Sequence, residues 1–373
     1  MKVPFLDLGR QHAAVRAQME GALRSVLDHQ RFILGPEVEA LESQVASLCG
    51  VSHGVGVASG TDALILALQA LGVGPGDEVV TSAFSFFATG SAIARLGAKP
   101  IFADIEPAGF TLDPAAVAAL RARQVRALMP VHLFGQCADM ESLADAAHVL
   151  GDRDLPMVED AAQAIGAMRN GRAAGSLGAA GCLSFYPTKN LGGAGDGGMV
   201  VSGDASLAAR VRSLRAHGDA GRYDHRELGM NSRLDSLQAA LLLVKLGHLA
   251  SWNQARRSLA DAYAGLLSDR PGGITLPATL AGSQHTWHQY VIRAPRRDEL
   301  AAHLTRDGIG SAVYYPIPLH RQVCFEYLGY REGDLPQTER ACREVLALPI
   351  YPGLRAAEQE QVAASIRSFY KGR

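Results

Sequence analysis

The sequence is poor in the features that mark several classes of protein. Only five of its 373 residues are cysteine, they lie far apart, and no two form a CxxC pair. This spacing argues against a disulfide framework and against a cysteine zinc site. No apolar run approaches the roughly 18 residues of a membrane-spanning helix. Neither sign of charge predominates, since 36 lysines and arginines stand against 37 aspartates and glutamates, so no basic surface for nucleic acid or a membrane is indicated.

The composition is otherwise that of a globular protein with a sizeable core. Hydrophobic residues make up 48% of the chain, which is typical of soluble domains, and 373 residues favour two domains over one. The first residues, MKVPFLDLGRQHAAVRAQ, hold no uninterrupted apolar segment of the signal-peptide kind. We therefore expect a cytoplasmic protein that acts on a small, mildly polar substrate.

Strand-like and helix-like segments alternate between about residues 50 and 215. The run HGVGVAS is typical of a strand, and GTDALILALQAL follows it with helical spacing of apolar residues. DEVVTSA, KPIFADI, VRALMPVH and LPMVEDAA are further strand-like runs, and GAAGCLSFYP and GGMVVSG are two more, joined by the segment that holds Lys189. This alternation predicts an α/β fold whose large domain has a mainly parallel sheet with helices on both faces.

The pattern changes after residue 233. A long helical stretch begins at Leu234 and carries a stripe of mostly apolar residues, namely Leu237, Leu241, Val244, His248, Trp252, Ala255, Leu259 and Tyr263. Beyond it, HTWHQYVIRAP, RDELAAHLTRDGI, GSAVYYPIPLH and TERACREVLALPIYP are expected to form a strand, a helix, a strand and a helix. We predict a large domain over residues 1–249 and a smaller α+β domain over 250–373.

Candidate ligand-binding residues stand where strands are expected to end, which is where open parallel sheets bind ligands. Gly60 and Thr61 follow the first strand, and free N–H groups at such a turn bind anions. Plain helix capping by Ser59 or Thr61 explains the same residues, and it is the commoner arrangement when this turn is taken singly. Glu159 and Asp160 follow a buried run and serve either chemistry or the capping of the next helix.

Three other motifs need a decision. GAGDGG at 193–198 matches the dinucleotide pattern G-x-G-x-x-G, but a strand and not a helix is expected after it, so we reject a nicotinamide-binding role for this motif. HTWH at 285–288 has no carboxylate or cysteine cluster beside it, and we expect no metal site. Lys189, between an apolar run and a glycine cluster, is either a solvated loop lysine or a nucleophile.

A lysine nucleophile, a carboxylate at a strand end and a phosphate-type turn together match the needs of pyridoxal phosphate. This cofactor has an aldehyde that forms a Schiff base, a pyridine nitrogen to be kept protonated and a phosphate to be bound. Phe86, at another expected strand-to-helix junction, offers a ring to stack on the pyridine. The residues therefore predict pyridoxal phosphate as the cofactor.

Nine motifs spread over nearly the whole chain follow in one order: VPFLDLGRQ, QRFILGPEVEALE, GTDAL, HLFGQCADM, VEDAAQAIGA, SFYPTKNLGGAGDGG, GMNSRLDSLQAALLLVKL, YYPIPLHRQ and LALPIYPGL. The ordered set resembles the DegT/DnrJ-type nucleotide-sugar aminotransferases, which have the aspartate aminotransferase fold. A single motif would not carry this resemblance, but the ordered set is highly specific.

The resemblance implies a role for each candidate residue. Lys189 would form the Schiff base with the cofactor and then move the proton between cofactor and substrate carbons, while Asp160 would keep the pyridine nitrogen protonated. Gln163 would contact the ring's phenolic oxygen and Phe86 would stack on the ring. The phosphate would be bound by Gly60, Thr61 and Ser184, with Asn231 reaching over from the partner subunit of a homodimer with shared active sites. Tyr315 and His320 would lie on the substrate side.

The resemblance also implies the reaction. An amino group would pass from L-glutamate to the cofactor and then to a keto group of a nucleotide-linked hexose. NSRLD at 231–235 resembles members that aminate carbon 3, whereas carbon-4 enzymes carry NYRM-like text. A carbon-4 enzyme and a non-catalytic regulator remain alternatives, and either a dTDP or a UDP sugar is compatible. Dehydratase relatives carry histidine where Lys189 stands, so the lysine argues against them.

Overall fold

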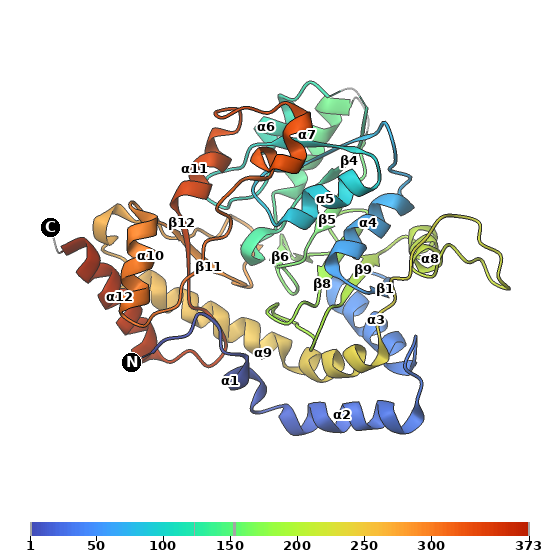
Figure 1. Cartoon of the computed structure of the whole chain (residues 1–373), viewed down its shortest axis with the longest axis horizontal. Helices are drawn as coiled ribbons and strands as arrows, with labels where there is room; N and C mark the ends of the chain where they lie inside the picture. The colour runs from blue at the N-terminus through green and yellow to red at the C-terminus, as the bar shows by residue number, and fades with distance from the viewer. Residues whose placement is uncertain (1, 123, 152–153, 372–373) are drawn as a thin grey trace.

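The computed structural model describes residues 2–122, 124–151 and 154–371, which form a mixed α/β fold (Figure 1). The α-helices are α1 (Leu8–His12), α2 (Arg16–His29), α3 (Pro36–Cys49), α4 (Gly60–Ala70), α5 (Phe87–Arg95), α6 (Pro114–Ala118), α7 (Met140–Gly151), α8 (Ala205–Leu214), α9 (Ser236–Leu266), α10 (Arg297–Arg306), α11 (Pro336–Glu344) and α12 (Ala356–Lys371). The strands are β1 (His53–Val57), β2 (Glu78–Ser82), β3 (Lys99–Ala103), β4 (Val125–Met129), β5 (Val158–Asp160), β6 (Met168–Arg169), β7 (Arg172–Ala173), β8 (Ala180–Ser184), β9 (Gly198–Ser202), β10 (Ser283–Gln284), β11 (Tyr290–Arg293) and β12 (Val345–Leu348). None of the described helices combines the length and the hydropathy that crossing a bilayer requires.

The central sheet is mainly parallel, as the sequence predicts. Its strand order is β1-β9-β8-β5 on one side and β3-β2-β4 on the other. Parallel bridges from Leu128 to Met157 and from Val131 to Asp160 bring the two parts together between β4 and β5. Only β9 runs antiparallel to both of its neighbours, since β2 pairs in parallel with β3 and β4, and β5 with β8.

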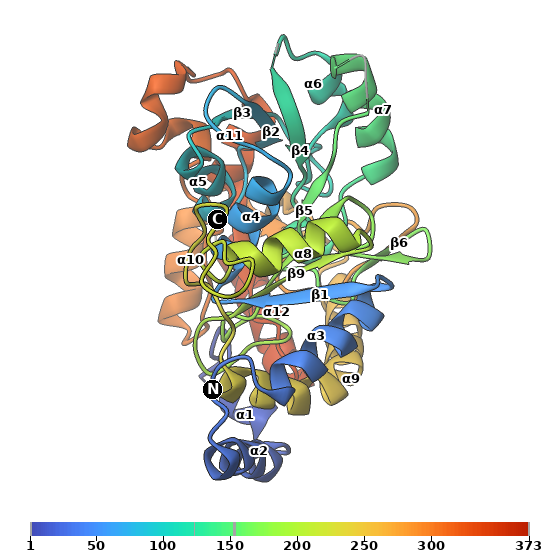
Figure 2. The same cartoon turned by 90° about the vertical axis from the view of Figure 1, so that its right-hand side faces the viewer.

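Helices cover both faces of this sheet. Successive residues of β9 point to opposite sides, so Val200 packs with residues of α4, α5 and α8, whereas Val201 packs with residues of α3, α7 and α9. Figure 2 shows α8 and α3 on opposite sides of β1 and β9. A sheet buried on both faces explains why its strands read as apolar runs without alternation. The α/β prediction is confirmed.

The long helix predicted after residue 233 is α9, which has 31 residues (Figure 1). It runs from the hydrophobic core around the central sheet to the hydrophobic core around β11 and β12. Leu242 packs in the core around the central sheet, and Tyr263 packs in the core around β11 and β12. The boundary at 249/250 falls within this helix and stays a prediction. The apolar stripe was only partly right, because buried positions of α9 include the polar Lys245, Asn253 and Arg256.

Two segments near the C-terminus differ from expectation. GSAVYYPIPLH forms no strand and makes only an isolated bridge, from Ala312 to Ala347. TERACREVLALPIYP divides into the end of α11 and the strand β12, whose four residues are all buried against β11. A short apolar run such as VLAL fits a strand or a helix equally, and here pairing with β11 decides.

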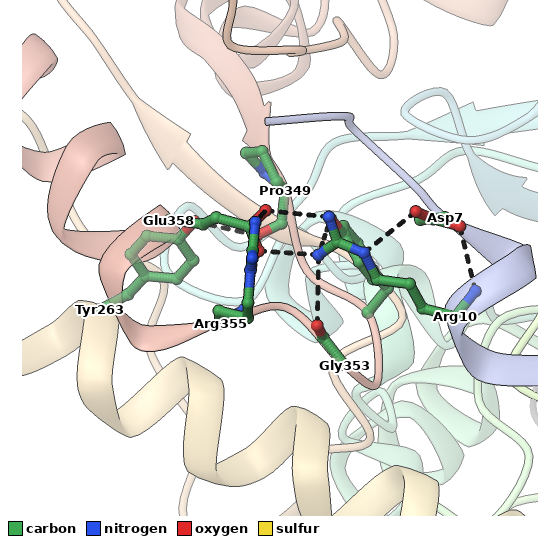
Figure 3. A network of polar contacts seen from close by, with 8 residues as sticks. Asp7, Arg10, Tyr263, Pro349, Gly353, Arg355 and Glu358 are labelled. Atoms are coloured by element: carbon green, nitrogen blue, oxygen red, sulfur yellow. Dashed lines mark hydrogen bonds and ion pairs between the residues drawn. The ribbon is translucent and has the colours of Figure 1, made fainter. Parts of the chain in front are cut away.

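The N-terminal segment is fastened to the C-terminal part by an ion pair (Figure 3). The two terminal nitrogens of Arg10, in α1, donate to the two carboxylate oxygens of Glu358, in α12, at 2.8 and 3.0 Å. Arg355 donates a further bond to the same carboxylate, at 2.8 Å. These donors hold the pKa of Glu358 well below its usual range. Two-pronged contacts of this kind are the strongest that arginine makes with a carboxylate.

Candidate active site

A cavity of about 460 Å³ lies at the carboxyl ends of the parallel strands, where ligands of such sheets bind. Its walls come from the segments that follow β1, β2, β4, β5 and β8, together with residues 288–289 and 314–315. Most of the residues singled out from the sequence lie on this wall: Gly60, Thr61, Phe86, Asp160, Gln163, Ser184, Lys189 and Tyr315. Segments far apart in the sequence are thus brought to one place.

The start of α4 forms a cradle suited to an anion. The hydroxyl of Ser59 caps the helix by accepting from the N–H of Asp62 at 3.1 Å, so capping does not require Thr61, which lines the cavity. A Cβ on Gly60 would lie 2.7 Å from Cβ of Ser184, so glycine is required by the close approach of β8. The start of α4 and the hydroxyl-bearing residues Thr61 and Ser184 therefore line the same cavity, and backbone N–H groups at a helix start favour an anion.

Asp160 presents a buried carboxylate to the cavity. Thr89 donates to its Oδ2 at 2.7 Å, and the N–H of Ala162 donates to its Oδ1 at 3.3 Å. Burial raises the pKa of Asp160, while these bonds and the positive charge of Lys189 oppose the rise. Both hydrogen-bond donors to Asp160 among the described residues are neutral, so a cationic ring nitrogen beside Asp160 would supply a counter-charge in direct contact with the carboxylate.

Glu159 has a different environment from its neighbour. It is fully buried and accepts four hydrogen bonds at 2.6 to 2.8 Å. The donors are Nε2 of His132 and the backbone N–H groups of Gly175, Leu177 and Gly178. Nδ1 of His132 accepts from the N–H of Ala138 at 3.1 Å, which places the ring proton on Nε2. Glu159 therefore holds loops together, and the sequence did not separate it from Asp160.

Lys189 stands in the turn that follows β8, and its N–H donates to the carbonyl of Tyr186 at 2.9 Å. Burial lowers the pKa of Lys189 to about 8, against the opposing pull of the Asp160 carboxylate. A lysine with this pKa has a sizeable fraction of neutral amine near neutral pH, and neutral amine is the nucleophilic form. The wall placement of Lys189 favours the nucleophile over the solvated loop lysine.

An aromatic side chain and an oriented amide complete this wall. Phe86 occupies the N-cap position of α5 and is 59% exposed, and the centroid of its ring is 6.3 Å from that of Tyr315. Gln163 accepts from the N–H of Phe134 at 2.7 Å and donates to the hydroxyl of Tyr315 at 3.1 Å. Burial raises the pKa of Tyr315, so this hydroxyl stays protonated.

Two of the predicted residues lie outside the cavity wall. Asn231 is exposed and accepts from Nε of Arg233 at 3.0 Å, so its predicted phosphate contact requires a second subunit. His320 is buried, with Nε2 at 3.2 Å from the carboxylate of Glu339. This contact with α11 keeps its ring off the cavity wall, and the placement does not favour the predicted substrate contact.

Sequence reasoning also missed residues of the site. Thr89 links Ser85 to Asp160 through bonds of 2.7 Å each, and its place one turn after Phe86 could have revealed it, since residues three apart share a helix face. His288 lies on the wall, although its HTWH motif was weighed only as a metal ligand. The described residues contain no group of three or more histidine, cysteine, aspartate or glutamate side chains able to hold a metal ion.

Comparison with known proteins gives full-length matches. The chain is 49% identical over 372 residues to a "pleiotropic regulatory protein" of Geobacillus stearothermophilus, covering 100% of this chain and 99% of that protein. It is 44% identical to dTDP-3-amino-3,4,6-trideoxy-alpha-D-glucose transaminase of Streptomyces venezuelae (99% and 96% covered). It is also 44% identical to UDP-N-acetyl-3-dehydro-alpha-D-glucosamine 3-aminotransferase of Acidithiobacillus ferrooxidans (99% and 98% covered).

Solved structures agree with these relatives. The crystal structure of S. venezuelae DesV in complex with a ketimine intermediate matches with a TM-score of 0.96 at 43% identity, covering 100% of this chain and 99% of that one. The structure of Bacillus subtilis NtdA with bound cofactor PMP matches with a TM-score of 0.91 at 32% identity, covering 99% and 85%. Residues 14–367 match one family throughout. The chain belongs to the DegT/DnrJ/EryC1/StrS aminotransferase family.

Proposed function

We propose that the protein is a pyridoxal phosphate-dependent aminotransferase that transfers an amino group from L-glutamate to the carbon-3 keto group of a nucleotide-linked hexose. The observation that carries this proposal is the convergence of Lys189, Asp160 and the start of α4 on one cavity. Carbon 3 is supported by the names of the S. venezuelae and A. ferrooxidans relatives, both of which are named for chemistry at that carbon. One is a dTDP-sugar enzyme and the other a UDP-sugar enzyme, so both nucleotides belong in the test.

The cavity wall fits this cofactor group by group. The phosphate would be held by N–H groups at the start of α4 and by the hydroxyls of Thr61 and Ser184, since Gly60 leaves room for close approach. The exposed ring of Phe86 gives a stacking surface. Pyridoxal phosphate, when bound, supplies an aldehyde that takes up the amino group and a ring that draws off electrons.

Two side chains would move or hold the protons. Asp160, buried and without a cationic hydrogen-bond partner among the described residues, would hold a proton on the ring nitrogen. Lys189 Nζ would take a proton from the donor's α-carbon and return one at the sugar carbon, because its lowered pKa of about 8 lets it both accept and release protons near neutral pH. Closing the cavity around these groups strengthens their electrostatic effect by excluding water.

We also propose a homodimer with shared active sites. Phe86 and Tyr186 line the cavity and remain 59% and 53% exposed in the single chain, and exposed apolar side chains gathered at one place are typical of interfaces. Asn231, exposed in its own chain, would then complete the phosphate site of the partner. A two-fold interface would exchange this contact in both directions.

A regulatory protein of the same fold is the second candidate, and the name of the G. stearothermophilus relative favours it. A regulator that has lost the chemistry is not expected to keep the lysine and the carboxylate together on one wall, as Lys189 and Asp160 are here. These two residues support the enzyme.

The test is a screen of 3-keto and 4-keto nucleotide sugars, as dTDP and UDP forms, with L-glutamate and the purified protein loaded with pyridoxal phosphate. We expect an aminated 3-keto sugar from the wild type and no detectable product from Lys189→Ala. The thermal unfolding midpoint of Lys189→Ala should stay close to wild type, because the side chain lies on a cavity wall and not in the core. Product only from 4-keto sugars would reassign the carbon, and turnover by Lys189→Ala would refute the mechanism.

A further inference from the structure

Arg256, on α9, is a buried cation without a carboxylate partner. Only 2% of its surface is exposed, and its described hydrogen bonds go to backbone carbonyls of Trp287, His288 and Ile350 at 3.0 to 3.2 Å, all from Nη1. Burial alone lowers the pKa of Arg256 to about 10. Burying an uncompensated charge is costly, so such a residue calls for an explanation.

The other buried arginines of the described chain all have an acidic partner. Arg169 pairs with Asp139 and Glu141, Arg215 with Glu42, and Arg297 with Asp298. The partly exposed Arg10 meets Glu358 with both terminal nitrogens, as Figure 3 shows. Pairing with a carboxylate is therefore the rule for enclosed guanidinium groups in this protein, and Arg256 departs from it.

The part of Arg256 that lacks partners is the edge formed by Nε and Nη2. Nε is buried without an acceptor, and among the described residues we find hydrogen bonds from Nη1 only. Nη1 carries two of the five guanidinium N–H donors, so three donors are free. Two parallel N–H groups on one edge form the fork that binds a carboxylate in two-pronged fashion.

A second cavity lies beside this residue and adjoins the active site. It has a volume of about 100 Å³, well above the roughly 15 Å³ that one water molecule needs. Arg256, Phe5 and Ile350 line it, and Thr188, His288, Gln289 and Tyr314 line both this cavity and the large one. Thr188 immediately precedes Lys189, so this space lies close to the lysine.

Gln289 gives an independent sign that something polar is missing here. Its side chain is 8% exposed, and its Oε1 is buried without a donor. The amide can turn by 180° and present its N–H groups instead. A buried amide that lacks a partner and a buried guanidinium that lacks a counter-ion line the same small cavity.

We infer that this cavity is the subsite for a carboxylate group of the amino donor, with the Nε–Nη2 edge of Arg256 as its main contact and Gln289 as a second donor. The inference rests on the proposed function, because an aminotransferase must bring an amino acid to Lys189. An amino acid must place its amine at the lysine and its charged carboxylate a short distance away, and the lining shared by the two cavities provides that arrangement. A bound carboxylate would supply the counter-charge that Arg256 lacks.

The first test measures binding without turnover. Glutarate has the carboxylates of glutamate but no amine, so it cannot react, and its affinity for the holoenzyme is measured by calorimetry. We expect Arg256→Met to bind glutarate at least about tenfold more weakly than wild type, since hydrogen bonds to a charged group are lost. Arg297→Met is the matched control, because Arg297 is also buried and also donates to backbone carbonyls but does not line this cavity. The affinity of this control for glutarate should stay within about threefold of wild type.

The second test separates the two half-reactions in single turnovers. The reaction with L-glutamate should show a KM raised at least about tenfold in Arg256→Met, and Arg256→Lys should recover part of the loss because it keeps the charge but not the fork. The reaction of the aminated enzyme with the keto-sugar should change by less than about threefold. L-Glutamine keeps the α-carboxylate of glutamate but has an amide in place of the side-chain carboxylate. Arg256→Met should therefore lose turnover of glutamine as well as glutamate only if Arg256 binds the α-carboxylate.

The outcomes decide between the inference and simpler explanations. Equal glutarate affinity in wild type and Arg256→Met, or a crystal of the glutarate complex with water alone at the Nε–Nη2 edge, would overturn the subsite. Equal damage to both half-reactions would make Arg256 a purely structural residue. A wild-type protein that performs neither half-reaction would refute the proposed function, and the calorimetry would still test the anion subsite.

Discussion

Replacing each of the two neighbouring carboxylates with its amide tests whether Glu159 and Asp160 have separate duties. In Glu159→Gln, the remaining carbonyl oxygen can accept from two of the four donors, but the amide nitrogen is itself a donor and cannot accept from the other two. Each buried donor left without an acceptor costs about 1–3 kcal/mol, so the variant should lose about 4 kcal/mol of stability. With roughly 2.1 cal/mol/K of unfolding entropy per residue, the thermal midpoint of a chain of 373 residues should fall by about 5 °C.

Asp160→Asn should give the opposite result. The hydroxyl of Thr89, which now donates to Asp160 at 2.7 Å, can rotate and accept from the new amide, so the loss of stability should stay below about 1 kcal/mol. A neutral amide cannot hold a proton on a ring nitrogen, and the donor half-reaction should slow by about 100-fold or more.

Thermal unfolding and single-turnover rates are measured on both variants, each serving as the control for the other. The reasoning fails if Glu159→Gln keeps the wild-type midpoint and loses activity, since Glu159 would then be the acid of the site. It also fails if Asp160→Asn turns over within about twofold of wild type.

Three further predictions follow from the wall of the large cavity. Burial disfavours the charged form of Lys189 and lowers its pKa to about 8. In the cofactor-free protein, the rate at which Lys189 reacts with an amine-acylating reagent should therefore rise through pH 8. A rate that rises only near pH 10 would contradict the lowered pKa. Gly60→Ala should retain less cofactor on dialysis than the wild type, because the new Cβ would lie 2.7 Å from Cβ of Ser184. The control Gly74→Ala has open space around the new Cβ and should retain the wild-type amount. Equal retention by the two variants would show that the close approach of Ser184 does not matter for cofactor binding. Mixed dimers of Lys189→Ala and Asn231→Asp chains, purified with two tags, should regain one working site of two, because one site combines an intact Lys189 with an intact Asn231. If mixing restores no activity, Asn231 acts in the active site of its own chain.

The sequence was sufficient for most of the fold and for the wall of the site. Strand ends that carry Gly60, Asp160 and Ser184 could be located because apolar runs stop there, and parallel strands bring their carboxyl ends to one edge. The sequence could not show which of Glu159 and Asp160 faces the cavity. Adjacent residues of a strand point to opposite sides of the sheet, and the sequence does not say on which side the cavity lies.

The substrate contact of His320 stays a prediction, and the reason that the residue lies off the cavity wall is geometric. His320 follows Tyr315 by five residues and lies in the short 3-10 helix Leu319–Arg321, which begins only after irregular backbone, so no periodicity relates the directions of the two side chains. Its ring nitrogen meets Glu339, which belongs to α11. Contacts between irregular segments and distant helices depend on the finished fold, and a local pattern does not contain them.

The buried polar face of α9 shows why the remaining part of the site needed the structure. Lys245, Asn253 and Arg256 recur at helical spacing on this helix. Lys245 donates to the carbonyl of Gly192 at 2.7 Å, and Asn253 accepts from Asn190 at 2.8 Å, so two of them hold the loop just after Lys189. Arg256 donates to the carbonyls of Trp287 and His288, and His288 lines the large cavity that also holds Lys189. Hydrophobic periodicity treats such polar residues as interruptions of a stripe, whereas here they face the core because loop carbonyls need donors there. The loop after Lys189 is therefore held by a helix that comes much later in the chain, and Nε of Arg256 is a buried donor on that polar face without a partner among the described residues.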